Sequence, residues 1–394
     1  MSLTHKLYPL EKARAIAEGE EFVEPPKETV PVAHALWRIA ASRVEAERDV
    51  PEKPLAAMDG YAIRSSDLAK GIKIRVVGRS SPEGGMPAIG EGEAVEVSTG
   101  APMPEGADAV VRREASKVVG GFLETVDRVW PGKDVFPPGE FVSKGDVLAE
   151  RGDVLTPYRV SLLLQAGVDY VEVYRVRATI VIASDVSRPE TPFRASAKGR
   201  DNVSPLIAGL MPWAEVRVVG PVPGGREGLE ETLDLAARTS DIIVTIGRAS
   251  VGPEDSVKEV VLKRGELLIP GFAVSVLKRG GLGRLNGKMV SILPAQCVSA
   301  ATAAHEVLLR PMKGLTGKSL VREGLYMLSE DVEVKKRMDT IYLVKIEGGE
   351  AKPLEWGIGL CRELAKADGY AFLSRGYHKR GERVKVVMLA GKGL

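Results

Sequence analysis

Strand-like and helix-like segments alternate between about Ala178 and Gly314, and this alternation constrains the fold more than any other feature of the sequence. The apolar runs TIVIAS, VRVVGPV, DIIVTIG and MVSILP are almost continuous, as is typical of strands buried on both faces. The intervening segments GLEETLDLAART, EDSVKEVVLKR and CVSAATAAHEVLLR have helical periodicity. We therefore predict a doubly wound parallel sheet with helices on both faces. Ligands bind such sheets where the strands end and the loops enter helices.

The rest of the chain has a different sequence pattern. Its 394 residues exceed the roughly 250 to 300 that a single core accommodates. From Asp49 to Pro138, short apolar runs such as IKIRVVG, EAVEVST, ADAVVRR and FLETVDRVW are separated by glycine and proline, a pattern that predicts a small β domain. The tail has strand-like MDTIYLVKI, YAFLS and RVKVVML with one short helix around GLCRELAKADG, which predicts a second β domain.

Three further segments have helical signals. LEKARAIAEG ends on Gly19, and PVAHALWRIAASRVEAE places apolar residues on one helical stripe. LTPYRVSLLLQAG has Thr156 as N-cap, Pro157 in the first turn and Gly167 as its stop. We expect four domains in an α/β and β multi-domain fold. They are a helical and extended linker domain (1–48 and 139–176), a β domain (49–138), an α/β domain (177–318) and a C-terminal β domain (319–394).

Composition excludes several classes of protein. The 55 basic and 53 acidic residues give a net charge of +2, and no basic stripe is interleaved with aromatic residues, so nucleic acid is not an expected partner. No run approaches the roughly 20 apolar residues that a membrane helix needs, and the N-terminal segment becomes charged too early for a signal peptide. We expect a soluble, cytoplasmic protein.

Cysteine and amide usage is sparse. The two cysteines, Cys297 and Cys361, are far apart without metal-ligand spacing, so neither a disulfide framework nor a zinc site is expected, and a reducing compartment fits. The only side-chain amides are Gln165, Gln296, Asn202 and Asn286, against 108 charged residues. That bias predicts a thermophilic source.

Two loops of the first β domain combine turn residues with polar groups. AAMDGYAIR, Ala56 to Arg64, is a short acidic turn where a strand begins. STGAPMPEGADAVV, Ser98 to Val111, holds a Thr-Gly pair and two prolines ahead of a strand. From the spacing alone, a structural turn is the favoured interpretation of both loops, and a functional loop is the alternative.

Two other loops follow strands of the predicted parallel sheet. GRASVGPEDSVKEV, Gly247 to Val260, leads from a strand into a helix, and its backbone N–H groups and helix N-terminus predict an anion site. Asp255 serves there either as a helix cap or as a ligand for a divalent ion beside a phosphate. LPAQCVSAA, which begins at Leu293, enters another helix at the same edge of the sheet. Two adjacent loops favour a pocket.

In their order, these loops resemble the landmarks of the molybdopterin molybdotransferase family, which comprises MoeA and the gephyrin E domain. MDGYA, STGAPMPEGADAVV, SVGxxDxVKE, LPxxxVSA and WGIGLCRELAKADGYAFL extend the resemblance over roughly residues 5 to 390. The resemblance implies an elongated homodimer whose site lies between two subunits. It implies insertion of molybdate, or tungstate, into adenylylated molybdopterin with release of AMP, assisted by Mg²⁺ or Zn²⁺. Other cofactor-biosynthesis proteins are further implied partners.

Carried over residue by residue, the resemblance names catalytic, substrate-binding and metal-binding positions. Carboxylates can hold a divalent ion and orient molybdate, while backbone amides and a lysine neutralise phosphate. The implied catalytic residues are Asp59, Thr99 and Asp255; the substrate-binding residues are Gly247, Arg248, Ser250, Gly252, Lys278, Pro294 and Ser299; the metal ligands are Asp59 and Asp255.

The sequence departs from the family pattern at several of these loops. The Gly-Gly-Val-Ser turn becomes GRAS, LPGNPVSA becomes LPAQCVSA, an acidic TGDEL-like loop reads SDVSR, and Phe141 replaces an expected acidic residue. Arg248 and Arg200 either bind phosphate or molybdate directly or are solvent-exposed charges. These changes leave two hypotheses: an active molybdotransferase, or a catalytically impaired paralogue that binds a pterin or a protein partner.

Overall fold

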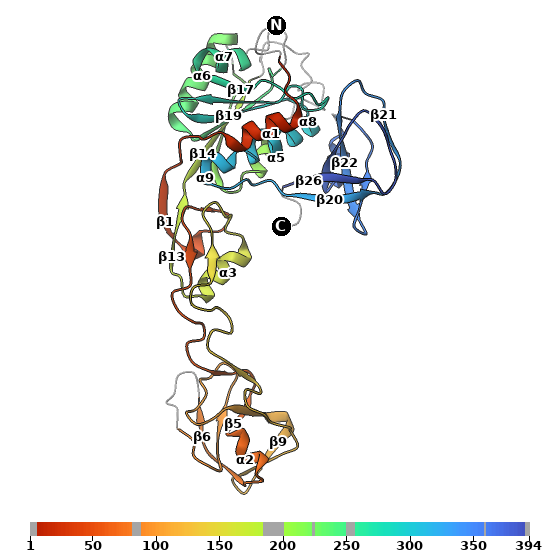
Figure 1. Ribbon diagram of the computed structural model, residues 1–394. Helices are drawn as coiled ribbons and strands as arrows, with labels where there is room; N and C mark the ends of the chain where they lie inside the picture. Colours follow the sequence, from red (N-terminus) through yellow and green to blue (C-terminus); the bar gives the residue numbers. More distant parts are fainter. Residues whose placement is uncertain are drawn as a thin grey trace.

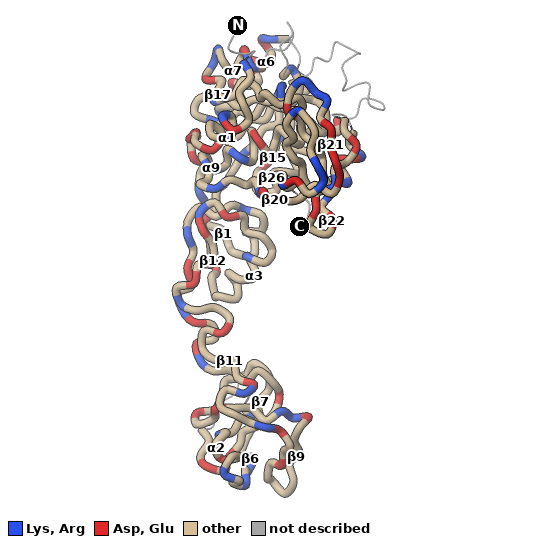
Figure 2. Tube along the Cα trace, turned by 45° about the vertical axis from the view of Figure 1, so that its right-hand side comes forward, with Lys and Arg blue, Asp and Glu red and all other residues tan. Residues whose placement is uncertain are grey.

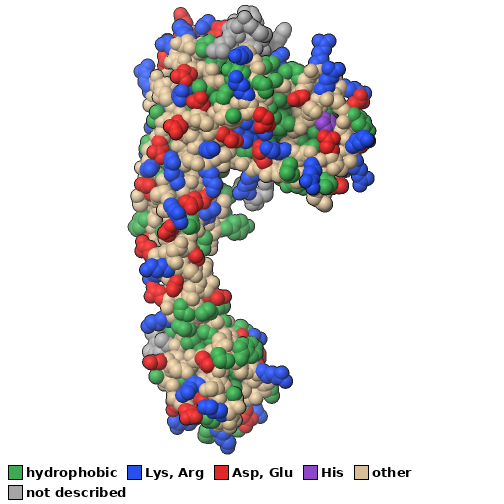
Figure 3. Space-filling view, viewed as in Figure 1, with side chains coloured by type: hydrophobic (Ala, Val, Ile, Leu, Met, Phe, Trp, Pro, Cys, Tyr) green, Lys and Arg blue, Asp and Glu red, His purple; other side chains and the backbone are tan. Residues whose placement is uncertain are grey.

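The molecule is elongated. The computed structural model describes residues 6–80, 88–183, 201–222, 225–249, 257–357 and 360–390. An α/β body and a C-terminal barrel lie side by side at one end, and a small β domain lies at the other (Figure 1). Basic and acidic residues are interspersed along the whole length, consistent with the small net charge (Figure 2). The space-filling view shows a narrow middle section between the two ends (Figure 3).

The α/β body is built on a six-stranded sheet with the order β15-β14-β16-β19-β18-β17. The strands are β14 (Val176–Ile182), β15 (Ala214–Val219), β16 (Ile242–Ile246), β17 (Glu266–Ile269), β18 (Gly281–Leu285) and β19 (Lys288–Leu293). Pairing among β15, β14, β16 and β19 is parallel, which confirms the predicted parallel sheet. Strands β18 and β17 add an antiparallel edge that was not predicted. The hairpin between β18 and β19 turns at Asn286 and Gly287, whose φ angles of 50° and 74° suit a two-residue turn.

Helices cover both faces of this sheet. They are α5 (Ser204–Gly209), α6 (Gly225–Thr239), α7 (Val257–Arg264), α8 (Cys297–Ala304), the π-helical turn η4 (His305–Leu309) and α9 (Met312–Thr316). On one face, α6 and α7 pack Leu233 and Val260 against Ile243 of β16. On the other, α5 and α8 pack Ile207 and Ala301 against the opposite side of the sheet. The predicted two-sided burial is therefore confirmed.

The distal β domain contains the predicted short strands. Its six-stranded sheet has the order β8-β5-β7-β6-β10-β9, and it includes one parallel pair, β6 with β7. Two small apolar clusters form its core. The elements are β5 (Gly60–Ile63), α2 (Ser65–Ala69), β6 (Ile74–Ser80), β7 (Glu93–Val97), β8 (Ala109–Arg112), η3 (Arg113–Ala115), β9 (Ser116–Val119) and β10 (Phe122–Thr125).

Between the two ends, the chain passes out to the distal domain and back again. A three-stranded sheet and α3 form a small body, and two short antiparallel pairs, β3 with β12 and β4 with β11, continue toward the distal domain. The elements are β1 (Lys27–Pro31), η2 (Val32–His34), β2 (Ile39–Ala40), β3 (Val44–Glu45), β4 (Leu55–Ala56), β11 (Val135–Phe136), β12 (Val147–Ala149), α3 (Pro157–Gln165) and β13 (Tyr170–Tyr174).

Two of the three predicted helices in the N-terminal half are confirmed. Helix α1 (Leu10–Gly19) ends where expected. Helix α3 begins after Thr156, whose side chain accepts a hydrogen bond from the backbone N–H of Arg159 at 3.4 Å. Gly167 follows α3 with a φ of 76°, a left-handed conformation typical of a helix stop.

The helix predicted for PVAHALWRIAASRVEAE is wrong. Only Val32–His34 forms a 3₁₀ turn; Ile39–Ala40 pairs with β13, and Val44–Glu45 pairs with β12. Trp37 has a φ of 65°, which interrupts any helix at that point. Of the apolar stripe, Ile39 and Ala40 are buried, whereas Ala33 and Leu36 are exposed, so strand pairing with distant segments takes precedence over local helical preference.

The C-terminal region is a closed five-stranded barrel, β20-β23-β22-β24-β26, with β21 and β25 paired beside it. Its elements are β20 (Glu323–Leu328), β21 (Val332–Val334), β22 (Thr340–Glu347), β23 (Glu350–Pro353), α10 (Cys361–Lys366), β24 (Gly369–Leu373), β25 (Gly376–His378) and β26 (Arg383–Met388). The predicted strands and the predicted short helix are all present. Helix α10 lies against α8 of the α/β body.

A buried cluster of charges joins helix α1, the π-helical turn and the barrel. Arg14 donates to both carboxylate oxygens of Glu306 at 2.9 and 2.8 Å, and Arg310 donates to the same carboxylate at 3.0 Å. Arg310 also bonds Glu323 of β20, and the Tyr370 hydroxyl donates to Glu306 at 2.9 Å. Burial opposes the charge of Glu306, but the hydrogen bonds and charges of the two arginines outweigh it and lower the pKa of that carboxyl.

Breaking this cluster should destabilise the protein strongly. We expect Arg14→Met to lower the free energy of unfolding by about 3 to 5 kcal/mol, because the buried Glu306 carboxylate then loses its bidentate hydrogen bonds to Arg14. Because the pKa of Glu306 is lowered on folding, the stabilisation is present above the ordinary carboxyl pKa and is lost as the pH falls through the folded value. Chemical denaturation at pH 7 and at pH 3 to 4 measures both effects.

The matched control is Arg175→Met, which removes an exposed ion pair with Glu215 that joins nitrogen and oxygen at 2.9 Å. Its expected cost is much smaller than that of Arg14→Met, because exposed ion pairs contribute little to stability. Equal losses in the two variants would contradict the role given to the buried cluster.

Candidate functional site

Three strands of the parallel sheet end side by side. The backbone N–H of Ala183 donates to Ile246 at 2.9 Å, and that of Gly247 donates to Leu293 at 3.0 Å. The loops that follow β14, β16 and β19 therefore leave the sheet at one edge, and the third of them enters α8 at Cys297. Open α/β sheets bind ligands at this edge, where the parallel strands end, and we call it the ligand edge.

The loop after β16 turns sharply as it leaves the sheet. Gly247 and Arg248 have φ angles of 89° and 45°, so two consecutive residues adopt the left-handed conformation. A glycine accommodates this freely, whereas an arginine does so at a cost in conformational energy. The guanidinium of half-buried Arg248 donates to the backbone carbonyl of Gly225, at the start of α6, at 3.2 Å. Arg248 is thus held at the ligand edge and belongs to the turn itself.

The other carried-over residues of the α/β body lie at the same edge. Pro294 directly follows β19, and Ser299 lies in the first turn of α8, where its side chain is buried. Lys278 belongs to the connection between β17 and β18, and its side chain is exposed. Because Gly281 pairs with Ile292 near the end of β19, that connection also lies at the ligand edge. The structure therefore brings five predicted binding residues to one edge: Gly247, Arg248, Lys278, Pro294 and Ser299.

Asp59 and Thr99 contact each other in the distal β domain. One carboxylate oxygen of Asp59 accepts hydrogen bonds from the backbone N–H of Thr99 at 2.6 Å and from its hydroxyl at 2.9 Å. The backbone bond, followed by the hydroxyl bond, lowers the pKa of Asp59. Both side chains are exposed, so an ionised, oriented carboxylate faces solvent. The structure thus brings the two predicted loops into contact through Asp59 and Thr99.

One chain does not bring all the predicted site residues together. Asp59 and Thr99 lie in the distal domain, at the far end of the molecule from the α/β body that holds Gly247 and Pro294 (Figure 1). The predicted positions Ser250, Gly252 and Asp255 lie outside the described residues, as do the SDVSR loop and Arg200.

The described residues do not by themselves form a site for Mg²⁺ or Zn²⁺. No group of three or more His, Cys, Asp or Glu side chains in the described ranges is placed to hold a metal ion. Asp59 offers one oxygen atom beyond the one that Thr99 engages, and a divalent ion of either kind takes at least four ligands.

The expectation that the cysteines form no disulfide is wrong. Cys297, the first residue of α8, is bonded to Cys361, the first residue of α10, and their Cα atoms are 6.0 Å apart. The bond spans 64 positions of sequence, and the pairing depends on how the barrel packs against the α/β body. Spacing along the chain carries no signal of such a pair.

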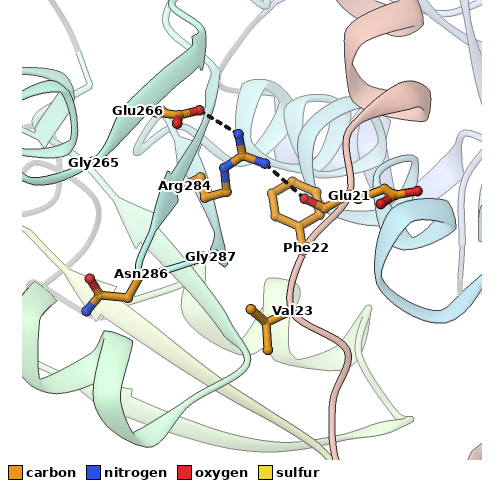
Figure 4. A pocket seen from close by; sticks show the side chains of 8 residues that line it. All are labelled: Glu21, Phe22, Val23, Gly265, Glu266, Arg284, Asn286 and Gly287. Carbon is orange, nitrogen blue, oxygen red and sulfur yellow. Dashed lines mark hydrogen bonds and ion pairs between the residues drawn. The ribbon is translucent and has the colours of Figure 1, made fainter.

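Two cavities flank the α/β body. An apolar cavity of about 340 Å³ lies beside the disulfide, which forms part of its wall together with Leu206, Ala301, Leu364 and Leu389. A larger open hollow of about 540 Å³ lies where β17 and β19 begin, at the edge opposite the ligand loops. Figure 4 shows that its arginine, Arg284, is bonded to Glu266 and to the backbone at Glu21. Because this hollow lies at the opposite edge and its arginine is already bonded within the protein, we do not assign it to the ligand site.

Comparison with known proteins identifies the family. A family model for the MoeA N-terminal region, domains I and II, matches residues 8–167, and one described as a probable molybdopterin binding domain matches residues 180–314. The molybdopterin molybdenumtransferase of Haemophilus influenzae is 31% identical over 282 residues, covering 69% of each chain. The chain belongs to the molybdopterin molybdenumtransferase (MoeA) family. The resemblance inferred from the sequence landmarks is thereby confirmed.

Relatives from archaea match almost the whole chain. A molybdopterin biosynthesis protein of Methanocaldococcus jannaschii is 27% identical over 99% of this chain and 100% of its own. The crystal structure of a molybdopterin biosynthesis MoeA protein from a Pyrococcus species superposes with a TM-score of 0.73 at 27% identity, over 98% of this chain and 100% of the other. The MoeA fold therefore extends over the distal domain and the barrel as well as the α/β body. Within the described ranges, no helix is long and apolar enough to span a bilayer.

Removing the threonine hydroxyl should test how Asp59 is held. In Thr99→Val the hydroxyl bond is lost, while the stronger backbone bond remains. We expect the pKa of Asp59 to rise toward its ordinary value without reaching it, as measured by NMR titration of the carboxyl carbon. Thr125→Val, which removes a hydroxyl that bonds Ala115 elsewhere in the same domain, should leave the Asp59 titration unchanged. An Asp59 pKa that is the same in Thr99→Val as in the unmodified protein would contradict this account.

Proposed function

We propose that this protein transfers molybdate, or tungstate, to adenylylated molybdopterin and releases AMP during assembly of the molybdenum cofactor. The observation that carries the proposal is family membership joined to geometry. The oriented Asp59 carboxylate is present in one loop, and five of the predicted binding residues lie at the ligand edge of the sheet. Relatives of this chain are named molybdopterin molybdenumtransferases.

The residues of the ligand edge suit a nucleotide-bearing anion. Lys278 is an exposed cation, and Arg248 holds a second positive charge at the turn after β16. Both charges would neutralise the phosphates of the adenylylated pterin. In the family's Gly-Gly-Val-Ser turn the backbone can approach the ligand closely. In the GRAS turn of this chain, we propose that the side chain of Arg248 contacts the same ligand instead.

Asp59 has a separate proposed role at the reacting end of the ligand. Its pKa is lowered by the two hydrogen bonds from Thr99, so the carboxylate remains charged at neutral pH. One of its oxygen atoms is fixed by Thr99, and this fixes the direction of the other. A preorganised anion of this kind orients a partner without the cost of reorganisation at the moment of reaction.

Since a single chain keeps Asp59 far from the ligand edge, we propose that two chains complete the site. The distal domain of one subunit would supply Asp59 and Thr99 to the α/β body of the other. The elongated form of the chain supports this arrangement, because the distal domain projects well beyond the body to which it is connected (Figure 1).

We also propose that the chain divides into four domains: residues 1–48 with 139–176, residues 49–138, residues 177–318 and residues 319–394.

Asp59→Asn tests the reaction. Asparagine keeps an oxygen that accepts from Thr99 and loses only the charge, so the fold should be unchanged while AMP release with molybdate falls by roughly 100-fold. The assay follows AMP released from adenylylated molybdopterin by chromatography. The matched control is Glu124→Gln, which removes an exposed charge of the same domain that is paired with Lys117. Unchanged AMP release in Asp59→Asn would overturn the proposal, and tight pterin binding without turnover in the unmodified protein would favour a binding paralogue.

Mixed dimers test whether the site is shared. Chains carrying Asp59→Asn and chains carrying Arg248→Glu should each be inactive alone. After dissociation and reassociation in equal amounts, half of the dimers contain one chain of each kind, and each of these has one intact site. Activity should therefore recover to about a quarter of the unmodified value if sites combine two chains. Recovery should be absent if each site is built from a single chain.

A further inference from the structure

The disulfide between Cys297 and Cys361 lies where two bodies of the molecule meet at the ligand edge. Cys297 is the last residue of the LPAQC loop and the first of α8, and Cys361 is the first residue of α10 in the barrel region. The apolar cavity lies beside the bond, and the side-chain amide of Asn202 donates to the Cys361 sulfur at 3.6 Å. The bond therefore ties the barrel directly to a loop of the ligand edge.

The ion pairs of Arg362 and Lys366 do not cross this boundary within the described part of the chain. Arg362 bonds Glu355 and Glu363, and Lys366 bonds Glu363, so these ion pairs stay within the segment itself. Leu364 contributes apolar contact to the cavity wall. Helix α10 has six residues, fewer than an isolated helix needs to be stable in water. Its position against α8 therefore depends on tertiary contacts, among them the disulfide, the burial of Leu364 and, directly after the helix, the burial of Ala367.

The two cysteine residues differ in exposure. Cys361 is exposed to solvent, whereas Cys297 is only 5% exposed. A reductant would approach the bond from the side of Cys361, and exposed disulfides are typically the labile ones. The sequence contains no other cysteine, so exchange with a second internal thiol is not available.

We propose that the Cys297–Cys361 disulfide is a redox-controlled clasp that fixes α10 and the barrel to the ligand loop after β19. In the oxidised protein the start of α8 and the start of α10 are covalently joined. In the reduced protein α10 separates locally from α8, the cavity opens, and the Pro294–Cys297 loop gains freedom.

The exchange chemistry is balanced with a dithiol or a small-molecule disulfide as co-reactant. For reduction, a thiolate of the dithiol attacks the Cys361 sulfur, the sulfur–sulfur bond breaks, and Cys297 leaves as a thiolate that takes up a proton. The second thiol of the reagent then attacks the mixed disulfide and releases Cys361, so two electrons and two protons pass to the protein. Oxidation by a small-molecule disulfide reverses these steps and yields two molecules of its thiol.

Amide hydrogen exchange, followed by mass spectrometry on the full-length protein, tests the clasp without any pterin or molybdate. In the protein oxidised with a small-molecule disulfide, no thiol should react with an alkylating reagent, and residues 361–366 should exchange slowly. After dithiothreitol treatment two thiols should react, and exchange in 361–366 should speed up by at least about tenfold. Strand β16 should exchange equally slowly in both states.

Cys361→Ser supplies the control, because its residues 361–366 should exchange rapidly with or without dithiothreitol. Three results would overturn the clasp: two reactive thiols after oxidation, equal exchange of 361–366 in the two redox states, or faster exchange in β16 on reduction, which would make the bond a global staple. The readout contains no transferase step, so failure of the clasp and failure of the proposed function are separate outcomes.

Discussion

The in-register parallel pairing of β14, β16 and β19 fixes where everything else at the candidate site lies. Each strand is buried on both faces, and hydrogen bonds between consecutive strand ends align the points at which the loops leave the sheet. A slip of one residue in any of these strands would turn its buried side chains to the opposite face and displace the following loop. The positions of Gly247 and Pro294 relative to each other are therefore a consequence of core packing.

A second constraint holds the surrounding bodies to that sheet. The Glu306 carboxylate lies on the π-helical turn that continues α8, and it is shared by arginines from α1 and from the same turn, while Arg310 also reaches β20. The helix that begins at the ligand loop thus ends in the charge cluster that anchors the barrel. Positioning of the ligand loop and attachment of the barrel share one continuous element.

Sequence patterns predicted the parts of the fold that depend on local burial. Continuous apolar runs located β14, β15, β16 and β19, and the cap at Thr156 located α3. The same reasoning failed for residues 31–47, where pairing with β13 and β12 overrides a helical stripe, and for the cysteines, which only the packing of distant bodies brings together. The Asn286-Gly287 hairpin was signalled by its turn residues, although the prediction did not use them. Landmark order identified the candidate residues and implied a site between two subunits, and the structure shows Asp59 in the domain at the far end of the molecule from Gly247.

The thin connection to the distal domain has a mechanical consequence. Only two segments cross it, joined by the short pairs β3 with β12 and β4 with β11. Asp59 lies beyond this neck and the main body lies before it. A small rotation at residues 44–56 and 135–149 would therefore displace the Asp59 carboxylate by a larger distance than it moves the neck itself. The position of that carboxylate relative to the main body thus depends on how rigid a few backbone hydrogen bonds are.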